Sequence, residues 1–234
     1  MKAVFKREFC AYFQGVLGFV FIAALFFFTG FYYFSYNLLG GVSDFSRLFL
    51  MLFPIVLFLV PILTMRLLSE DRHARTDQIL LTAPVSRWGI ILGKYLAALC
   101  VYLMAISATL ITALITALYG QPDWPVFLGN LVGLILLGSA LIAICMFLSG
   151  LTESQVIAAL LGFTASFFLF MTDALATAFR QESVKAVFYY LSFDKRYTPF
   201  TYGLLDLSNA VFFLSIIGLF LFFSVLTLEQ RQHA

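Results

Sequence analysis

The stretch WPVFLGNLVGLILLGSALIAICMFLSGLT, residues 124–152, contains no Asp, Glu, Lys or Arg. A helix needs roughly 20 consecutive apolar residues to cross a hydrocarbon core of about 30 Å. A charged side chain at the centre of such a helix costs about 2.5 to 3.5 kcal/mol on insertion scales. Residues 124–152 therefore predict a helix that spans a membrane.

Similar stretches without charge recur on both sides of this one. They are residues 9–43, 48–65, 95–122, 154–172 and 207–228. Over the 234 residues 62% are hydrophobic and 11% are charged, whereas an ordinary soluble domain carries about 25% charged residues. The alternating segments of about 10 residues that mark a membrane β-barrel are absent.

The fold class predicted is an all-α integral membrane protein with six transmembrane helices in a single domain, residues 1–234. The expected spans are approximately 16–37, 48–67, 90–119, 126–150, 155–178 and 208–228.

The basic residues predict the orientation. If the N-terminus is inside, nine basic residues fall on the cytoplasmic side: Lys2, Lys6, Arg7, Arg66, Arg72, Arg75, Arg87, Lys94 and Arg231. Five fall outside: Arg47, Arg180, Lys185, Lys195 and Arg196. Because cytoplasmic loops carry the excess of Lys and Arg, we expect both termini in the cytoplasm and the chain in the plasma (inner) membrane.

The N-terminal segment is amphipathic. Aromatic side chains recur at helical spacing between residues 1 and 13, while Lys2 and Lys6 share another face. This pattern favours a helix lying in the cytoplasmic interface before the first span. The alternative is a simple basic flank of that span.

Motifs of enzymes and of coupled carriers are absent from the sequence. There is no G-x-x-x-x-G-K-[ST] loop to cradle phosphates and no H-E-x-x-H metal motif. Secondary carriers usually keep ionisable groups near the membrane midplane. The nearest candidate, Asp173, is expected at the outer end of the fifth span, where a solvated helix end is the simpler interpretation.

Charges instead gather in one loop, SEDRHARTDQILLTAPVSRWG, residues 69–89. Ser69 with the two acidic residues after it suits a helix N-terminus, and Thr76 can cap a second short helix that ends before Pro84. The apolar ridge at 79–81 suits burial in a groove of a partner protein or in membrane headgroups.

Three stretches carry a family resemblance. LTMRLLSEDRHARTDQILLTAPVSRWGIILGKYLAAL (63–99) resembles the first cytoplasmic loop of type 2 ATP-binding-cassette (ABC) transporter permeases, particularly their gliding-motility-like branch. LGSALIAICMFLSGLTESQVIAAL (137–160) is similar to spans four and five of that branch, and FTYGLLDLSNAVFFLSIIGLFLFFSVLTLEQRQ (200–232) to its C-terminus.

The resemblance implies the permease subunit of an exporter that forms the translocation pathway as a homodimer or heterodimer. ATP and Mg would bind to separate cytoplasmic ATPase subunits, with no cofactor in this chain. The first cytoplasmic loop would be a coupling helix docked on the ATPase. The contact residues implied are Glu70, Asp71, Arg72, Arg75, Thr76, Gln78, Leu80 and Leu81. Many relatives have Gly and Glu where this chain has Arg75 and Gln78, so the resemblance does not define the ATPase contacts at these two positions.

Pro54 and Pro61 lie inside the predicted second span. Proline removes a backbone hydrogen bond from a helix, so each position is a candidate bend for gating. A merely tolerated kink is the alternative.

Two other stretches predict packing and cover. Gly129 and Gly133 form a small-x-x-x-small step that favours close helix contact within the subunit. The outer segment 180–207 suits short amphipathic helices over the external exit, or a passive interfacial cover.

Other function classes remain open at this point: an ATP-independent secondary carrier or channel, and a membrane assembly subunit. The apolar interior suits lipids, hydrophobic peptides, drugs or lipid-linked glycans as substrates. Besides the ATPase and a second permease subunit, the partners expected are membrane lipid and an accessory extracytoplasmic protein; no nucleic acid is expected.

Overall fold

The computed structural model describes residues 1–73, 86–178 and 182–230. Within these ranges the chain is helical, with short connections and no strand. The elements are α1 (Lys2–Gln14), α2 (Leu17–Tyr32), the π-helix η1 (Tyr33–Leu38), α3 (Ser46–Thr64), α4 (Ser69–His73), α6 (Arg87–Tyr119), α7 (Trp124–Leu151), α8 (Gln155–Ala178), α9 (Glu182–Leu191), α10 (Phe193–Thr201) and α11 (Leu207–Gln230).

Six of the described segments are long and apolar enough to cross a membrane, which confirms the predicted fold class. They are Leu17–Leu38, Ser46–His73, Arg87–Tyr119, Trp124–Leu151, Gln155–Ala176 and Leu207–Gln230.

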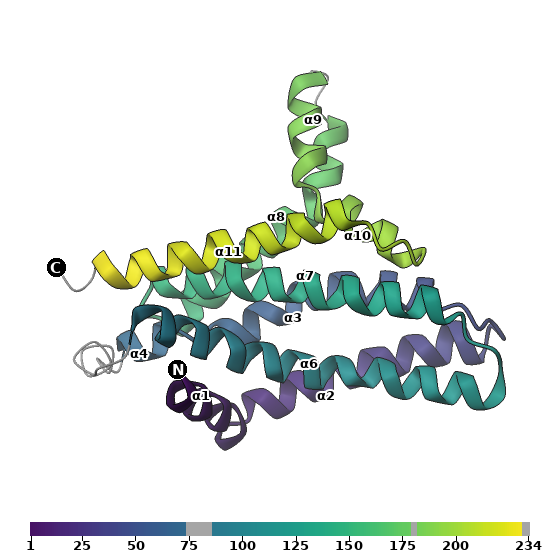
Figure 1. Cartoon of the computed structure of the whole chain (residues 1–234), viewed down its shortest axis with the longest axis horizontal. Coiled ribbons are helices and arrows are strands. Elements are labelled where there is room, and N and C mark those ends of the chain that lie inside the picture. The colour runs from purple at the N-terminus through teal and green to yellow at the C-terminus, as the bar shows by residue number, and fades with distance from the viewer. Residues whose placement is uncertain (74–85, 179–181, 231–234) are drawn as a thin grey trace.

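The long helices run side by side along the longest axis of the molecule (Figure 1). α7 lies at the centre, where it packs against α3, α6, α8, α10 and α11. Its most apolar window is 67% buried, against 22% for α8 and 28% for α11. The charge-free stretches of α7, α8 and α11 therefore differ in role, because the first forms the core and the other two expose large apolar faces.

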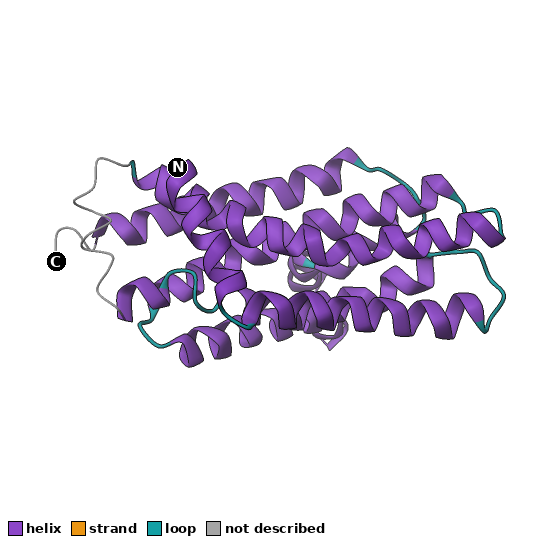
Figure 2. Ribbon diagram, turned by 90° about the horizontal axis from the view of Figure 1, so that it is seen from below, coloured by secondary structure: helices purple, strands orange, loops and turns teal. Residues whose placement is uncertain are grey.

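One end of the bundle collects both ends of the described chain. The N-terminus, α4, the start of α6 and the end of α11 gather there (Figures 1 and 2). We call it the terminal end, and the other the opposite end. Six helices that each cross the membrane require this arrangement, because a chain that crosses an even number of times returns to the side from which it started.

α1 is a separate helix before the first span, as predicted. It packs against α6 and α2 and is followed by a bend at Gly15. Its buried face consists of Val4, Glu8 and Tyr12. Three of the four aromatic residues predicted at helical spacing share a face, since the ring of Phe9 lies beside those of Phe5 and Phe13, with centroids 5.8 and 5.1 Å apart, whereas Tyr12 lies on the buried face.

The outer segment contains two short helices, α9 and α10, and α10 packs deep against α7 and α3. The glycine step makes this approach possible. A Cβ atom on Gly133 would lie 2.7 Å from Cβ of Phe200, and one on Gly129 would lie 2.8 Å from Cα of Gly203. The prediction of close packing within the subunit is therefore confirmed.

Candidate functional site

The described part of the predicted coupling loop begins with α4. Glu70, Asp71 and Arg72 lie in this short helix at the terminal end. The other predicted contact residues, Arg75, Thr76, Gln78, Leu80 and Leu81, and the stop at Pro84 lie outside the described residues. The site that can be built is therefore the base of the loop, where α4 leaves the bundle.

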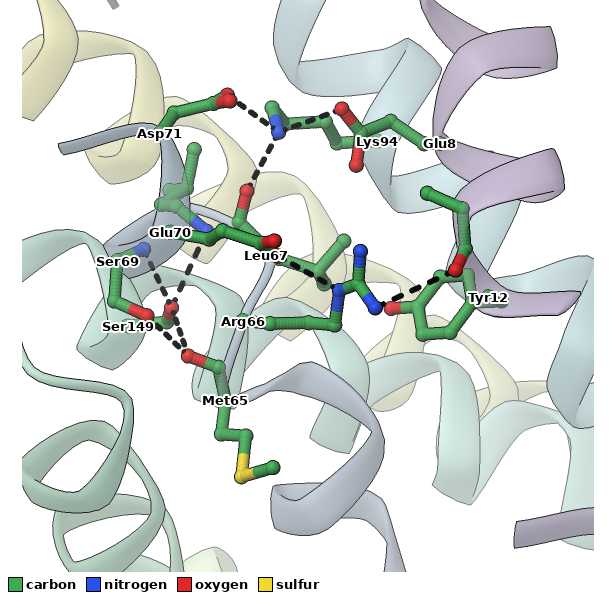
Figure 3. A network of polar contacts seen from close by, with 12 residues as sticks. Glu8, Tyr12, Met65, Arg66, Leu67, Ser69, Glu70, Asp71, Lys94 and Ser149 are labelled. Atoms are coloured by element: carbon green, nitrogen blue, oxygen red, sulfur yellow. Dashed lines mark hydrogen bonds and ion pairs between the residues drawn. The ribbon is translucent and has the colours of Figure 1, made fainter. Parts of the chain in front are cut away.

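A buried lysine sits at this base. Lys94, on α6, has a side chain only 2% exposed. Three acceptors surround its Nζ atom: Oδ2 of Asp71 at 2.6 Å, the carbonyl oxygen of Leu67 at 2.7 Å and Oε1 of Glu8 at 3.0 Å (Figure 3). An ammonium group has three donors, so each can be satisfied at once. We call Glu8, Asp71 and Lys94 the Lys94 cluster.

Arg7 balances the charge of this cluster. Its Nη2 atom lies 2.5 Å from Oε1 of Glu8 and 3.4 Å from Oδ1 of Asp71. Two cations therefore face two carboxylates. A buried ion is tolerated only when it is paired and hydrogen-bonded, and removal of one partner costs about 3 to 5 kcal/mol. The cluster thus holds α1, α4 and α6 together.

Arg66 makes a second link between the loop base and α1. Its Nε atom lies 2.8 Å from Oε2 of Glu70, one helical turn further on. Its guanidinium carbon lies 5.5 Å from the ring centroid of Tyr12, and its Nη1 donates to the carbonyl oxygen of Ala11 at 3.4 Å. The Glu70 side chain remains 46% exposed, so it is oriented by Arg66 but still open to a partner.

Tyr12 links α1 to the end of α3. Its hydroxyl donates to the carbonyl oxygen of Leu63, at the end of α3, at 2.9 Å. Burial raises the pKa of this phenol above its ordinary value, so the donor stays protonated.

Two sets of contacts join the loop base to the last turn of α7 and to the connection between α7 and α8. The Ser149 hydroxyl accepts from the backbone N–H groups of Leu68 and Ser69, at 3.3 and 3.2 Å, and donates to the carbonyl oxygen of Met65 at 3.0 Å (Figure 3). On the other side, Arg72 Nε lies 2.8 Å from Oε1 of Glu153. α4 is therefore fastened to neighbours on both sides.

The far side of the loop is also fixed where α6 begins. The Ser86 hydroxyl accepts from the Gly89 N–H at 3.2 Å, as predicted for a helix cap. Arg87 forms an ion pair with Glu229, at the end of α11. The loop thus leaves and re-enters the bundle at two anchored points.

Both prolines predicted for gating lie within α3, which continues as a helix through them. Pro61 is buried against α8, where a Cβ atom on Gly162 would lie 2.9 Å from that of Pro61. The Thr64 hydroxyl donates to the carbonyl oxygens of Val60 and Pro61, at 2.9 and 3.3 Å. Pro61 is therefore part of a packed contact between α3 and α8, and the role of both prolines in gating stays a prediction.

Sequence reasoning missed the main partners of this site. It counted Lys94 only among the basic residues of the cytoplasmic side and gave no role to Glu8, whereas the structure buries Lys94 beneath α4. One signal was available, because Glu8 is the sole acidic residue in an otherwise basic α1. The contact joins residues 86 positions apart, which helical periodicity does not reveal.

The comparison with known families supports the resemblance to type 2 ABC permeases, but not to one branch of them. A family model described as "ABC-2 family transporter protein" matches residues 14–229. The match contains the 69–89 loop and all six candidate spans except the last residue, Gln230, whereas most of α1 precedes it. No curated protein matches the chain.

Proposed function

The chain belongs to the ABC-2 transporter family, and from this premise we propose that it is the permease of an ATP-driven exporter coupled to separate ATPase subunits. The permease itself is a multi-pass membrane component. ATP and Mg would bind to the partner chain, which would dock on the 69–89 loop from the cytoplasm. In this proposal the terminal end faces the cytoplasm, which the excess of basic residues there supports.

The observation that carries the proposal is the way the loop base is fastened. A force on α4 would act on α6 and α1 through the Lys94 cluster, and on the α7–α8 turn through Arg72 and Ser149. Packed helices respond to such a force as rigid bodies, because well-packed cores do not deform continuously. The loop is therefore built as a lever.

The exposed residues of α4 offer a surface to the partner. Glu70 is half exposed and His73 is exposed, whereas Asp71 is turned inward to Lys94. We infer that Glu70 contacts the ATPase, and that Asp71 transmits motion rather than making that contact. The apolar ridge that includes Leu80 and Leu81 is proposed as the other half of the contact, on the resemblance alone.

Dimerisation and the finer family branch are also proposals. The exposed apolar faces of α2, α8 and α11 leave room for a second permease subunit beside lipid. Assignment to the gliding-motility-like branch and export as the direction rest on the quoted stretches. The substrate class proposed is apolar or amphiphilic, because the described spans present few charges.

The test is co-purification of the tagged chain from its native host in mild detergent, with ATP hydrolysis assayed on the product. We expect a stoichiometric P-loop ATPase, and we expect Leu80→Asp to remove it because a charge would disrupt an apolar ridge. Glu70→Ala should weaken the association. Arg47→Gln, at the opposite end, is the matched control and should retain the ATPase. A pure chain with no ATPase and no hydrolysis would favour the carrier or the assembly subunit.

A further inference from the structure

An open pocket lies where α9, α10 and α11 meet. Its volume is about 410 Å³, and the residues that line it are Tyr189, Tyr190, Lys195, Arg196 and Asn209. It shares no residue with the Lys94 cluster. In Figure 1, α9 projects away from the bundle next to the junction of α10 and α11, so the pocket lies at the side of the bundle.

Two cations line this pocket beside aromatic rings. Nζ of Lys195 lies 3.1 Å from the ring centroid of Tyr189. The guanidinium carbon of Arg196 lies 5.8 Å from the ring centroid of Tyr190 and 5.1 Å from that of Phe212. Such contacts hold a cation in place by the ring quadrupole, but they do not neutralise it.

Neither cation has a carboxylate within 4.0 Å in the part of the chain that the structure describes. Arg196 Nη1 donates to Oδ1 of Asn209 at 3.0 Å, and Asn209 in turn donates to Asp206 at 3.0 Å. This bond orients the guanidinium and leaves its other N–H groups for a ligand. The pocket therefore presents two positioned positive charges.

Phosphate is the anion that this pair fits best. A guanidinium fork and a lysine ammonium both form charge-assisted hydrogen bonds to phosphate oxygens. The volume is within the usual range for a small-molecule site, roughly 300 to 1,000 Å³, and exceeds what a bare anion needs. A phosphate that carries an organic substituent is therefore favoured over a free ion.

The surroundings indicate what that substituent is. The connection from α10 to α11 exposes large apolar side chains: Leu204 at 63%, Leu205 at 62% and Leu207 at 81%. Tyr190, on the pocket rim, is 69% exposed, and tyrosines with an apolar body and a polar tip are typical of membrane interfaces. Charge in the pocket and apolar surface beside it match an amphiphile.

We propose that this pocket binds the phosphate headgroup of a membrane amphiphile, with Lys195 and Arg196 contacting the phosphate and the acyl chains lying on the neighbouring apolar surface. Binding at this pocket needs no ATPase, so it can be tested independently of the proposed function.

The test measures binding of dioctanoyl phosphatidic acid to the purified full-length chain by native mass spectrometry in detergent. Dioctanoylglycerol, with the same chains and no phosphate, is the neutral comparison, and inorganic phosphate is the competitor. We expect saturable binding of the phosphatidic acid, and Lys195→Gln with Arg196→Gln should weaken it at least about 10-fold, since the loss of a single charge-assisted bond of about 1.5 kcal/mol already gives that factor.

Two further variants keep the result interpretable. Lys195→Gln alone replaces an exposed side chain, so it should fold normally and still weaken binding. Arg47→Gln removes the same kind of cation–aromatic contact outside the pocket, with Arg47 5.4 Å from the Tyr36 ring, and should leave binding unchanged. Equal binding by the double variant would overturn the site. Equal binding of dioctanoylglycerol would overturn the role of phosphate, and displacement by inorganic phosphate at similar concentration would overturn the amphiphile.

Discussion

At the scale of single residues, Lys94 is the position on which the loop base depends. Its ammonium is buried and contacts both Glu8 and Asp71. Buried charges are stabilising only as complete sets, because the loss of water must be offset by every partner. The sequence shows a lysine near the end of a span, which is a common interfacial position, and nothing local distinguishes it from one that is buried.

Replacement of this lysine should destabilise the protein strongly. Lys94→Met removes the buried one of the two cations that face Glu8 and Asp71 and leaves Arg7 in place, and we expect a loss of about 3 to 5 kcal/mol in the free energy of unfolding. Thermal unfolding of the purified chain in detergent would measure it. In a double-mutant cycle, Asp71→Asn in the Lys94→Met background should cost less than Asp71→Asn alone. Strictly additive effects would show that the contact carries no energy.

The pKa of Asp194, in the first turn of α10, predicts that the stability of the fold depends on pH. Its pKa is raised above the ordinary value of 3.8, first by burial and then by the carboxylate of Asp173, while Lys195 opposes the shift. As pH rises above 3.8, the unfolded chain ionises before the folded one does, so folding loses stability until the raised pKa is passed.

Asp194→Asn, which stays neutral, removes this loss. We therefore expect the melting temperature of the variant to rise relative to that of the parent chain as pH increases above about 4, and the difference to stop growing once the raised pKa of Asp194 has been passed. A gap that stays constant from acid to neutral pH would contradict the assigned shift.

At the scale of elements, the glycine step on α7 gives the sharpest test of packing. A methyl group on Gly133 would lie 2.7 Å from Cβ of Phe200, so α7 and α10 would have to separate. We expect Gly133→Ala to cost about 1 to 3 kcal/mol.

Gly218, on α11, is the matched control for this substitution. A Cβ atom there meets nothing within 4 Å. Gly218→Ala should therefore leave the melting temperature unchanged or raise it slightly, because alanine favours helix. Equal losses at both positions would mean that the α7–α10 contact is not the cause.

Sequence patterns predict the elements better than their partners. Absence of charge defines the six spans, and caps such as Ser86 mark where α6 begins. The π-helix Tyr33–Leu38 and the depth of α10 have no local signature, because both depend on contacts with distant helices. Tyr197 of α10, for example, donates to the carbonyl oxygen of Phe49 across 148 positions.

In the candidate site, too, the sequence predicts which residues lie in the helix but not which partners they contact. Glu70, Asp71 and Arg72 lie in a helix at the predicted place, and the family resemblance identified them. Their separation into an exposed Glu70 and an inward Asp71 follows from tertiary packing alone. Glu8 had a weak local signal, whereas Ser149 had none, since a serine inside an apolar span is ordinary.

At the scale of the whole molecule, the proposed lever lies at one end of a bundle whose long helices reach the other end. α6 runs from Arg87, beside the loop, to Tyr119 at the opposite end. The proposed mechanism is that an ATPase moves the loop, and that the Lys94 cluster makes α6 follow. The mechanism requires that a change at the loop base alters movement far from it.

The most direct measurement is the distance between two labelled positions, both at the opposite end of the bundle, in the complete complex with and without nucleotide. Spin labels at Tyr119, which is 88% exposed, and at Leu39, which is 72% exposed, report on α6 and on the segment after η1. The native cysteines 10, 100 and 145 would first be replaced. We predict that ATP shifts the distance distribution in the parent complex, and that Asp71→Asn abolishes the shift while the ATPase stays bound. A shift of the same size in the Asp71→Asn complex would contradict coupling through the Lys94 cluster.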